Sequence, residues 1–155
     1  MASKKNEGGI KIIARNRKAH YRFAIIETLE AGLVLSGHEV KSLRDGQITL
    51  DESLVREEKG ELFLFNAYIP PYSHLTNVEY NPTRNRKLLL HRKEIKRLSS
   101  QVQVKGMTMV PLEIYFKNGI AKVLIALAKG KNTEDKRETI KKRESDKEIA
   151  RNVQR

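Results

Sequence analysis

Short apolar runs, rich in β-branched and aromatic residues, recur along the chain up to about Lys129 and are typical of strands. The first two runs cover residues 10–14 and 21–29. Residues 30–32 (Glu-Ala-Gly) are expected to form a turn or bulge, after which a strand resumes over 33–35. The N-terminal part of the chain is therefore predicted to be mainly β-structure.

Two hairpins are predicted further along. Each pairs two apolar-rich runs across a short turn that contains glycine: 53–56 with 61–65 around 58–60, and 110–116 with 120–128 around 117–119. The second turn contains Asn118-Gly119, and Asn-Gly is a strong hairpin signal because both residues tolerate a positive φ.

Two segments show helical signals instead. Ser36 stands three residues before Glu39, the spacing of a capping box, and this predicts a short helix over 37–44 that ends at Asp45-Gly46. Between His91 and about Val104, apolar residues recur at spacings of three and four (Ile95, Leu98 and Val102), which predicts an amphipathic helix. Gly106 is its expected end.

These elements predict the fold class. Two prolines within residues 69–72 open a long loop, and no strand–helix–strand alternation is present. We expect a mainly β protein: a closed or nearly closed antiparallel barrel of about six to seven short strands with two or three helices. A barrel like the oligonucleotide/oligosaccharide-binding (OB) fold is favoured, and a sandwich is the alternative.

The composition changes after Lys129. From Gly130 to the end, the sizeable apolar residues are only Ile140, Ile149 and Val153, which bury too little surface to offset the entropy of ordering the segment. Glu, Lys and Arg nevertheless favour helix, and residues 131–155 contain no proline or glycine. We expect three parts: a flexible N-terminus (1–9), the OB-like barrel (10–129), and a charged tail (130–155) that is unfolded when free and helical on a polyanionic surface. A permanently solvated tail is the alternative.

The net charge of +12 points to a polyanionic partner, nucleic acid before membrane. The surplus lies in three patches: +6 over residues 1–22, +6 over 82–97 and +4 over 129–155, while the remainder sums to −4. A purely solubilising charge would be spread more evenly. Binding through such patches should weaken steeply with salt.

Catalytic and metal sites find little support. The chain has no cysteine, and its four histidines (His20, His38, His74 and His91) show no metal-ligand spacing. The adjacent pair Asp51-Glu52 is better explained as part of a solvated loop, and no glycine-rich phosphate loop or nucleophile elbow is present. We expect no enzymatic activity, no metal and no cofactor.

Nor does the sequence indicate a membrane or an export signal. No apolar stretch approaches the roughly 18–20 residues of a membrane span. The polar segment from Met1 to Gly9 has no apolar run behind it, so we expect no secretory signal and a cytoplasmic protein.

Candidate RNA contacts combine cations with aromatic rings. His20-Tyr21 follows a basic run (Arg15, Asn16, Arg17 and Lys18), and stacking beside phosphate contacts is a common way to grip unpaired RNA. Core packing is the alternative for Tyr21. Arg84 and Arg86, followed by Lys87, stand two apart, so an extended chain would place both guanidinium groups on one face, suited to phosphate. A flexible basic loop is the alternative for that segment.

Several of these segments, taken in order, resemble the small protein B family, whose members partner transfer-messenger RNA in bacterial ribosome rescue. The resemblance runs from about Ile12 to Arg151. It is carried by 30–33 (Glu-Ala-Gly-Leu), 37–44 (Gly-His-Glu-Val-Lys-Ser-Leu-Arg), 81–90, Lys122-Val123, 128–131 (Ala-Lys-Gly-Lys) and 135–137 (Asp-Lys-Arg).

The resemblance implies an OB-like barrel that binds the transfer-RNA-like domain of transfer-messenger RNA and replaces the missing anticodon half. The positions that it implies for RNA contact are Glu30, Leu89 and Lys122, together with Asn16, Lys18, His20 and Tyr21. Adjacent basic residues (Arg17, Arg84, Arg86 and Lys87) complete the expected RNA-binding set. A carboxylate such as Glu30 would accept hydrogen bonds from base amino groups or a ribose 2′-hydroxyl.

For the tail, the resemblance implies entry into the empty messenger channel of a stalled small ribosomal subunit, next to its 16S ribosomal RNA and decoding centre. Gly130 would be a hinge, and the expected ribosome contacts are Lys131, Asp135, Lys136, Arg137, Lys141, Arg143 and Arg151. Elongation factor Tu and alanyl-charged transfer-messenger RNA would be indirect partners.

Two departures from the family pattern stand in the tail. Many relatives carry histidine where this chain has Glu134, and Asn152-Val153-Gln154 stand where the family often has Ile-Met-Lys. Two other functions remain open on the residues alone: a ribosomal or ribosome-assembly protein that binds ribosomal RNA directly, and a general single-strand binder.

Overall fold

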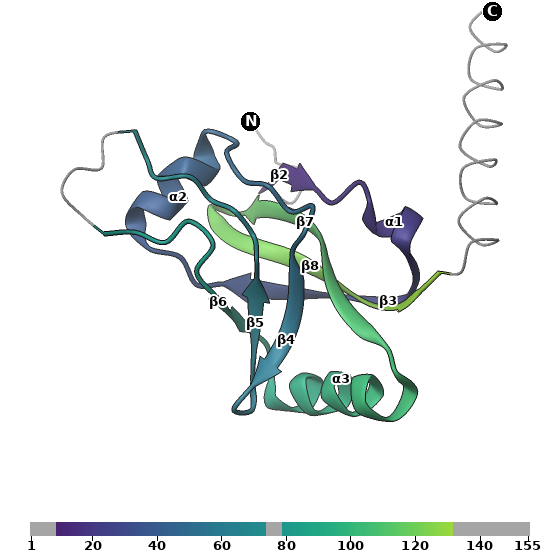
Figure 1. Cartoon of the computed structure of the whole chain (residues 1–155). Coiled ribbons are helices and arrows are strands. Elements are labelled where there is room, and N and C mark those ends of the chain that lie inside the picture. The colour runs from purple at the N-terminus through teal and green to yellow at the C-terminus, as the bar shows by residue number, and fades with distance from the viewer. Residues whose placement is uncertain (1–8, 74–78, 132–155) are drawn as a thin grey trace, which may run out of the picture.

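The computed structural model describes residues 9–73 and 79–131. Within them lie seven strands and three helices (Figure 1). The strands are β2 (Ile10–Arg15), β3 (Phe23–Leu33), β4 (Leu54–Glu58), β5 (Glu61–Phe65), β6 (Arg86–Leu89), β7 (Thr108–Lys117) and β8 (Ile120–Gly130). The helices are α1 (Ala19–Arg22), α2 (Gly37–Arg44) and α3 (Arg92–Lys105).

The strands form an antiparallel sheet that closes on itself. Its order is β2-β7-β4-β5-β6-β3-β8, and an additional pairing of β7 with β8 completes the ring. Strand β2 lies outside this ring, paired with the far part of β7 from Ile10 opposite Lys117 to Arg15 opposite Glu113. The predicted mainly β, closed antiparallel barrel is confirmed.

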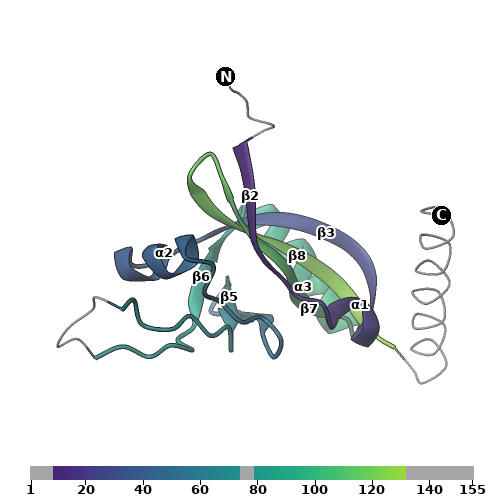
Figure 2. The same cartoon turned by 90° about the horizontal axis from the view of Figure 1, so that it is seen from above.

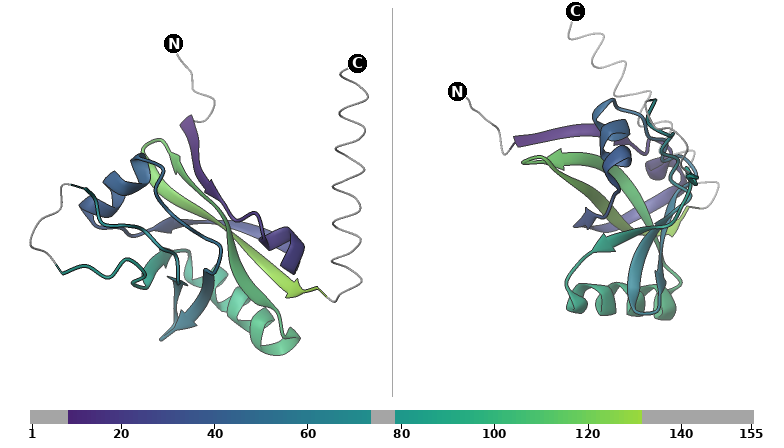
Figure 3. Two further views of the ribbon diagram at one scale, coloured as in Figure 1. Left: turned by 45° about the horizontal axis from the view of Figure 1, so that its top comes forward. Right: turned by 90° about the vertical axis from the view of Figure 1, so that its left-hand side faces the viewer.

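Alternation along the strands builds the core inside the ring. In β5, Leu62 and Leu64 are fully buried, and in β8, Val123 and Ile125 are almost so, since every second side chain points inward. Helix α3 lies across one end of the barrel (Figures 1 and 3), and its Leu98 is buried in the same core.

A second, smaller apolar cluster forms outside the ring, beneath α1. Ala19 of α1 packs on Val110 and Leu112 of β7 and on Ala126 and Ala128 of β8. Alternation along β7 supplies both clusters, and the β-bulge between Pro111 and Glu113 shifts its phase, so that Val110 and Leu112 face outward before it and Ile114 and Phe116 face the core after it. Figure 2 shows that helices α1 and α2 lie at opposite ends of the β3–β8 pair.

Local signals predicted several elements correctly. Helix α2 carries the predicted capping box, in which Ser36 N–H donates to Glu39 Oε1 at 2.9 Å. The β7–β8 turn places Asn118 at φ 52° and Gly119 at φ 79°, and Gly106 ends α3 at φ 63°. The β4–β5 hairpin also lies where the sequence placed it.

Three expectations were wrong. Residues 21–22 belong to helix α1 instead of a strand, because Ala19 is buried beneath this short turn. Residues 30–32 form no turn: β3 runs unbroken to Leu33, with its irregularity between Ile25 and Glu27. The long loop expected after residues 69–72 is interrupted by β6, which pairs with β5 and β3, so the alternative of a flexible basic loop does not hold there either.

Candidate nucleic-acid interface

A shallow groove on the outside of the barrel brings together three residues that are far apart in the sequence. Glu30, Leu89 and Lys122 line it with Gly32, Leu90, His91 and Glu94, and its volume is about 410 Å³. Strand register explains the meeting, because Gly32 of β3 lies opposite both Leu89 of β6 and Lys122 of β8. Glu30 stands two residues earlier on β3 and therefore shares that face.

The floor of this groove is apolar and its walls are charged. Leu89 is 54% exposed, an uncommon state for a leucine in a sheet, and it packs beside Gly32. A β-carbon added at Gly32 would stand 3.2 Å from Leu89 Cβ, so glycine leaves the space that Leu89 occupies. The result is an apolar surface between a carboxylate and an ammonium group, a combination that suits a nucleobase next to a phosphate.

Glu30 is held by two residues of β7. Tyr115 Oη donates to Glu30 Oε2, and Lys117 Nζ lies 3.5 Å from Glu30 Oε1. The hydrogen bond from Tyr115 lowers the pKa of Glu30, burial opposes it, and the charges of Lys117 and Lys122 lower it further. Glu30 is therefore an ionised acceptor at neutral pH.

Tyr115 and Lys117 were missed by the sequence reasoning. A signal was nevertheless present, because the Asn-Gly turn fixes the register of the hairpin. Counting back from Lys117 opposite Ile120 places Tyr115 opposite Lys122, on the same face as the groove.

A second hollow, of about 300 Å³, lies at the other side of the same face. Its lining includes three of the expected RNA-binding residues: it is formed by Arg15, Asn16, Arg17, His20, Leu112, Glu113 and Leu124. Lys18 Nζ lies nearby at 4.0 Å from Asp51, with half of its side chain exposed. Tyr21 is half-buried in α1.

Asn16 differs from the expectation of a direct contact. It is only 6% exposed, its Nδ2 donates to Pro111 O at 3.0 Å, and its backbone N–H donates to Leu112 O at 2.7 Å. Asn16 therefore fastens the segment between β2 and α1 to β7 and so positions its basic neighbours.

Leu124 joins the two hollows. It lines the second hollow and lies opposite Glu30 of β3 on one side and Glu113 of β7 on the other. Because α1 covers only the end of this face, where Ala126 and Ala128 are buried, the region around Leu124 is left partly exposed. The two hollows thus belong to one surface across β3, β8 and β7.

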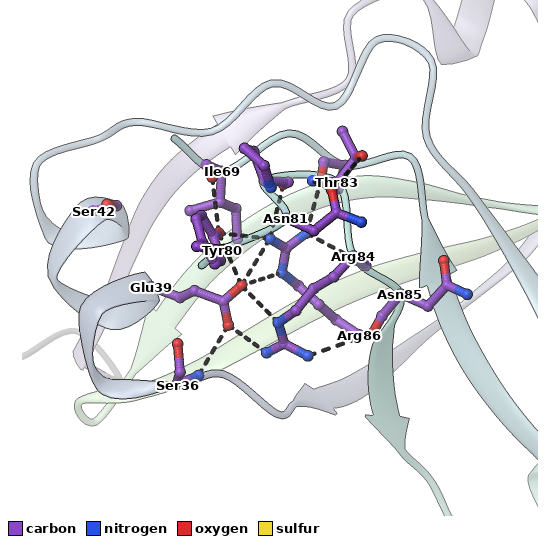
Figure 4. A network of polar contacts seen from close by, with 12 residues as sticks. Ser36, Glu39, Ser42, Ile69, Tyr80, Asn81, Thr83, Arg84, Asn85 and Arg86 are labelled. Carbon is purple, nitrogen blue, oxygen red and sulfur yellow. Dashed lines mark hydrogen bonds and ion pairs between the residues drawn. The ribbon is translucent and has the colours of Figure 1, made fainter. Parts of the chain in front are cut away.

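The basic segment 84–87 lies differently from the expected phosphate-binding surface. Arg84 and Arg86 do share a face, but it is the face that meets Glu39 of α2 (Figure 4). Arg86 is fully buried and donates to Ala67 O at 2.8 Å and to Pro82 O at 3.0 Å, so it offers nothing to a phosphate. Lys87, with 43% of its side chain exposed, lies 3.0 Å from Glu61.

The buried cluster ties α2 to the segment that leads into β6. Burial alone would raise the pKa of Glu39, but hydrogen bonds from Arg84 and the Ser36 N–H, with the charge of Arg86, lower it to about 2. Tyr80 Oη donates to Glu39 Oε2 at 3.0 Å and accepts from Arg86 at 2.9 Å (Figure 4). Glu39 is thereby ionised, paired and satisfied inside the protein.

The start of the tail is attached to the barrel. Gly130 is the last residue of β8 and lies opposite Phe23, and its role as a hinge stays a prediction. Lys131 continues this attachment: its N–H donates to Arg22 O at 2.9 Å and its Nζ to His20 O at 2.7 Å. The remaining expected tail contacts, from Asp135 to Arg151, lie outside the described residues.

The described residues contain neither a candidate metal site nor a membrane-spanning helix. Over 9–73 and 79–131, no group of three or more His, Cys, Asp or Glu side chains could hold a metal ion. In that same part of the chain, no helix is long and apolar enough to cross a membrane.

Comparison with known proteins gives a consistent result. The sequence model of the family described as SmpB protein matches residues 13–155. A relative from Persephonella marina, described as an SsrA-binding protein, is 49% identical over 143 residues, which cover 92% of this chain and 94% of the relative. A second, from Geobacillus kaustophilus and with the same description, is 51% identical over 147 residues, which cover 95% and 94%.

A solved structure agrees in fold as well as in sequence. It is described as "tmRNA-SmpB: a journey to the center of the bacterial ribosome" and is 48% identical to this chain. The match covers 82% of this chain and 93% of that one, with a TM-score of 0.65.

Proposed function

The chain belongs to the SmpB protein family, and from that membership we propose that it is an RNA-binding protein of trans-translation, which binds transfer-messenger RNA and acts with it on stalled ribosomes. The observation that carries this proposal is the groove in which Glu30, Leu89 and Lys122 meet. These residues come from three strands, and together they offer a hydrogen-bond acceptor, an apolar surface and a cation.

The groove is suited to a folded RNA more than to a uniform polyanion. Lys122 pairs with a phosphate oxygen, Leu89 contacts a base or ribose, and Glu30 accepts from a base amino group or a 2′-hydroxyl. Because a carboxylate repels phosphate, its place at the centre of the interface selects for RNA that presents a donor at that point.

The second hollow extends the contact along the RNA. Arg17 lines it and Lys18 follows in the chain, and both neutralise phosphates of the transfer-RNA-like domain, while His20, which also lines it, and Tyr21 in α1 offer rings beside these cations. The barrel then occupies the place of the anticodon half that this domain lacks.

The tail completes the proposal. Residues from Lys131 onward, with Asp135, Lys136 and Arg137 first, enter the messenger channel of the small subunit when it is empty and contact 16S ribosomal RNA near the decoding centre; Lys141, Arg143 and Arg151 follow further along. Elongation factor Tu delivers the alanyl-charged transfer-messenger RNA together with this protein. A ribosomal or assembly protein that binds ribosomal RNA directly is the second candidate, and its support is the overall basic charge.

The test is the RNA that stays bound to the full chain during purification. Sequencing should recover one species of a few hundred nucleotides that contains a transfer-RNA-like domain. Ribosomal RNA recovered without it would favour the second candidate, and a mixture of unrelated RNAs would contradict both.

A pair of variants tests the division of labour between barrel and tail. Removing residues 132–155 leaves β8 and the Lys131 contacts in place, so RNA affinity should persist while rescue of stalled ribosomes fails. Glu30→Gln in the full chain should weaken RNA binding itself. Loss of RNA binding in the truncated protein to the same degree as in Glu30→Gln would contradict this division.

A further inference from the structure

Tyr115 is buried on β7, with its hydroxyl group directed at Glu30 on β3, two strands away. We propose that Tyr115 is a positioning residue of the RNA groove: its hydroxyl group fixes the Glu30 carboxylate as an acceptor that faces the RNA. This inference rests on the proposed function, since it concerns how the same groove recognises its RNA.

Strand register places the pair across Lys122. Tyr115 lies opposite Lys122 of β8, and Lys122 lies opposite Gly32 of β3, two residues from Glu30. All of these side chains therefore leave the same face of the sheet. The Tyr115–Glu30 hydrogen bond runs across β8 beside the groove lining and joins the two outer strands of this triplet.

Without such a contact, Glu30 would have a poorly defined orientation. A glutamate side chain has three rotatable bonds, and restricting them on binding costs entropy. Tyr115 donates a hydrogen bond to Glu30 Oε2, and Lys117 donates one to Oε1. Both oxygens are therefore held before the RNA binds. Binding is stronger when the recognising group is already in place.

The contact leaves room for the RNA. Each carboxylate oxygen can accept more than one hydrogen bond, so the contacts from Tyr115 and Lys117 do not use the full capacity of Glu30. The remaining capacity accepts only from a donor, such as an exocyclic base amine, an imino N–H or a ribose 2′-hydroxyl. A phosphate oxygen or a base carbonyl is rejected at this point.

The polarity of the pair is stable over a wide pH range. Burial raises the pKa of Tyr115, and the Glu30 carboxylate raises it further, so the phenol keeps the proton that it donates. The ionisable groups around the Tyr115–Glu30 pair are Lys117 and Glu113 on β7, Lys122 on β8, and His91 and Glu94, which line the groove from the start of α3.

The experiment compares Tyr115→Phe, Glu30→Gln and the double variant in the full chain, with the transfer-RNA-like domain of transfer-messenger RNA as the probe. Tyr115→Phe keeps the buried ring and loses only the hydroxyl group. RNA affinity should fall about tenfold, a loss of about 1.4 kcal/mol, because the Glu30 carboxylate is no longer held in place before the RNA binds. The double variant should bind no more weakly than Glu30→Gln alone. Tyr68→Phe, which removes a hydroxyl group from an exposed tyrosine outside the groove, is the matched control and should bind like the wild type.

A second measurement does not depend on RNA. The midpoint for protonation of the Glu30 carboxylate, followed by the NMR chemical shift of its carboxyl carbon, should rise toward 4.5 in Tyr115→Phe. Wild-type affinity in Tyr115→Phe together with weak binding in Glu30→Gln would overturn the inference, as would an unchanged midpoint. If the wild type itself does not bind this RNA, the proposed function fails, and the midpoint still decides whether Tyr115 fixes Glu30.

Discussion

Arg86 Nε donates a hydrogen bond of 2.8 Å to Glu39 Oε2, and both side chains are 0% exposed. The pair joins α2 to β6, two elements that are 47 residues apart at these positions. Since β6 also carries Leu89 into the groove that Glu30 and Lys122 line, the buried pair helps to fix the position of one residue of that groove.

Arg86→Met should destabilise the protein by about 3–5 kcal/mol, because removing one partner of a buried pair leaves the other charge incompletely compensated. Urea unfolding followed by circular dichroism measures this loss. Arg56→Met, at an exposed position of β4 where the guanidinium contacts the ring of Phe65 at 5.8 Å, is the control and should change stability by no more than about 1 kcal/mol. Similar stability of the two variants would contradict a structural role for Arg86.

Acidification should remove the contribution of Glu39. Its pKa is about 2 in the folded protein against 4.5 ordinarily, so the folded state favours the ionised form. The resulting stabilisation is complete above pH 4.5 and is lost as the pH falls toward about 2. Glu30 acts in the same direction, so the difference between the wild type and Glu39→Gln isolates Glu39.

Urea midpoints at a series of pH values measure that difference. The advantage of the wild type over Glu39→Gln should shrink steadily as the pH falls through this window. A difference that stays constant down to about pH 2 would show that the carboxylate of Glu39 is not the source.

Gly32→Ala should weaken RNA binding about fivefold, a loss of about 1 kcal/mol. Its β-carbon would stand 3.2 Å from Leu89 Cβ and displace the apolar floor of the groove. Gly37→Ala is the matched control, because a β-carbon at this position in α2 meets nothing within 4 Å and alanine favours helix. Fluorescence anisotropy measures the RNA affinity of both variants. Wild-type affinity in Gly32→Ala as well as in Gly37→Ala would contradict a role for the Leu89 position in RNA binding.

The two charged walls of the groove should respond differently to salt. Lys122→Ala removes a phosphate contact, so the plot of log affinity against log salt should flatten by about one unit. Glu30→Gln should weaken binding with an unchanged slope, because it removes an acceptor and no cation. Equal slopes in the wild type and Lys122→Ala would exclude a phosphate contact for Lys122.

Elements governed by short-range chemistry could be predicted from the sequence. The capping box of Ser36 and Glu39 starts α2, and Asn118-Gly119 forms the turn that sets the register of β7 and β8. Each signal lies within a few residues of the element that it specifies, so no tertiary information is needed.

Features that depend on residues far away in the chain could not be predicted from the sequence. Helix α1 has four residues, and its burial depends on Val110 and Ala126, about a hundred positions away. The sequence around Arg86 is that of a basic surface segment, and only the fold shows that Arg86 is buried against Glu39. The groove residues Leu89 and Lys122 were expected only from the family resemblance. The periodicity of the sequence does not reveal that they meet.

The attachment of Lys131 has a mechanical consequence. Its N–H and its Nζ donate to Arg22 O and His20 O of α1, directly after Gly130, the last residue of β8 that is paired with β3, so this end of β8 is held by α1 as well as by β3. Hydrogen bonds between strands lie across the strand axis, and a pull along β8 would load the ladders to β3 and β7 together, in shear. Tension applied at Lys131 would therefore reach β3 and β8, which carry Glu30 and Lys122 of the groove, directly.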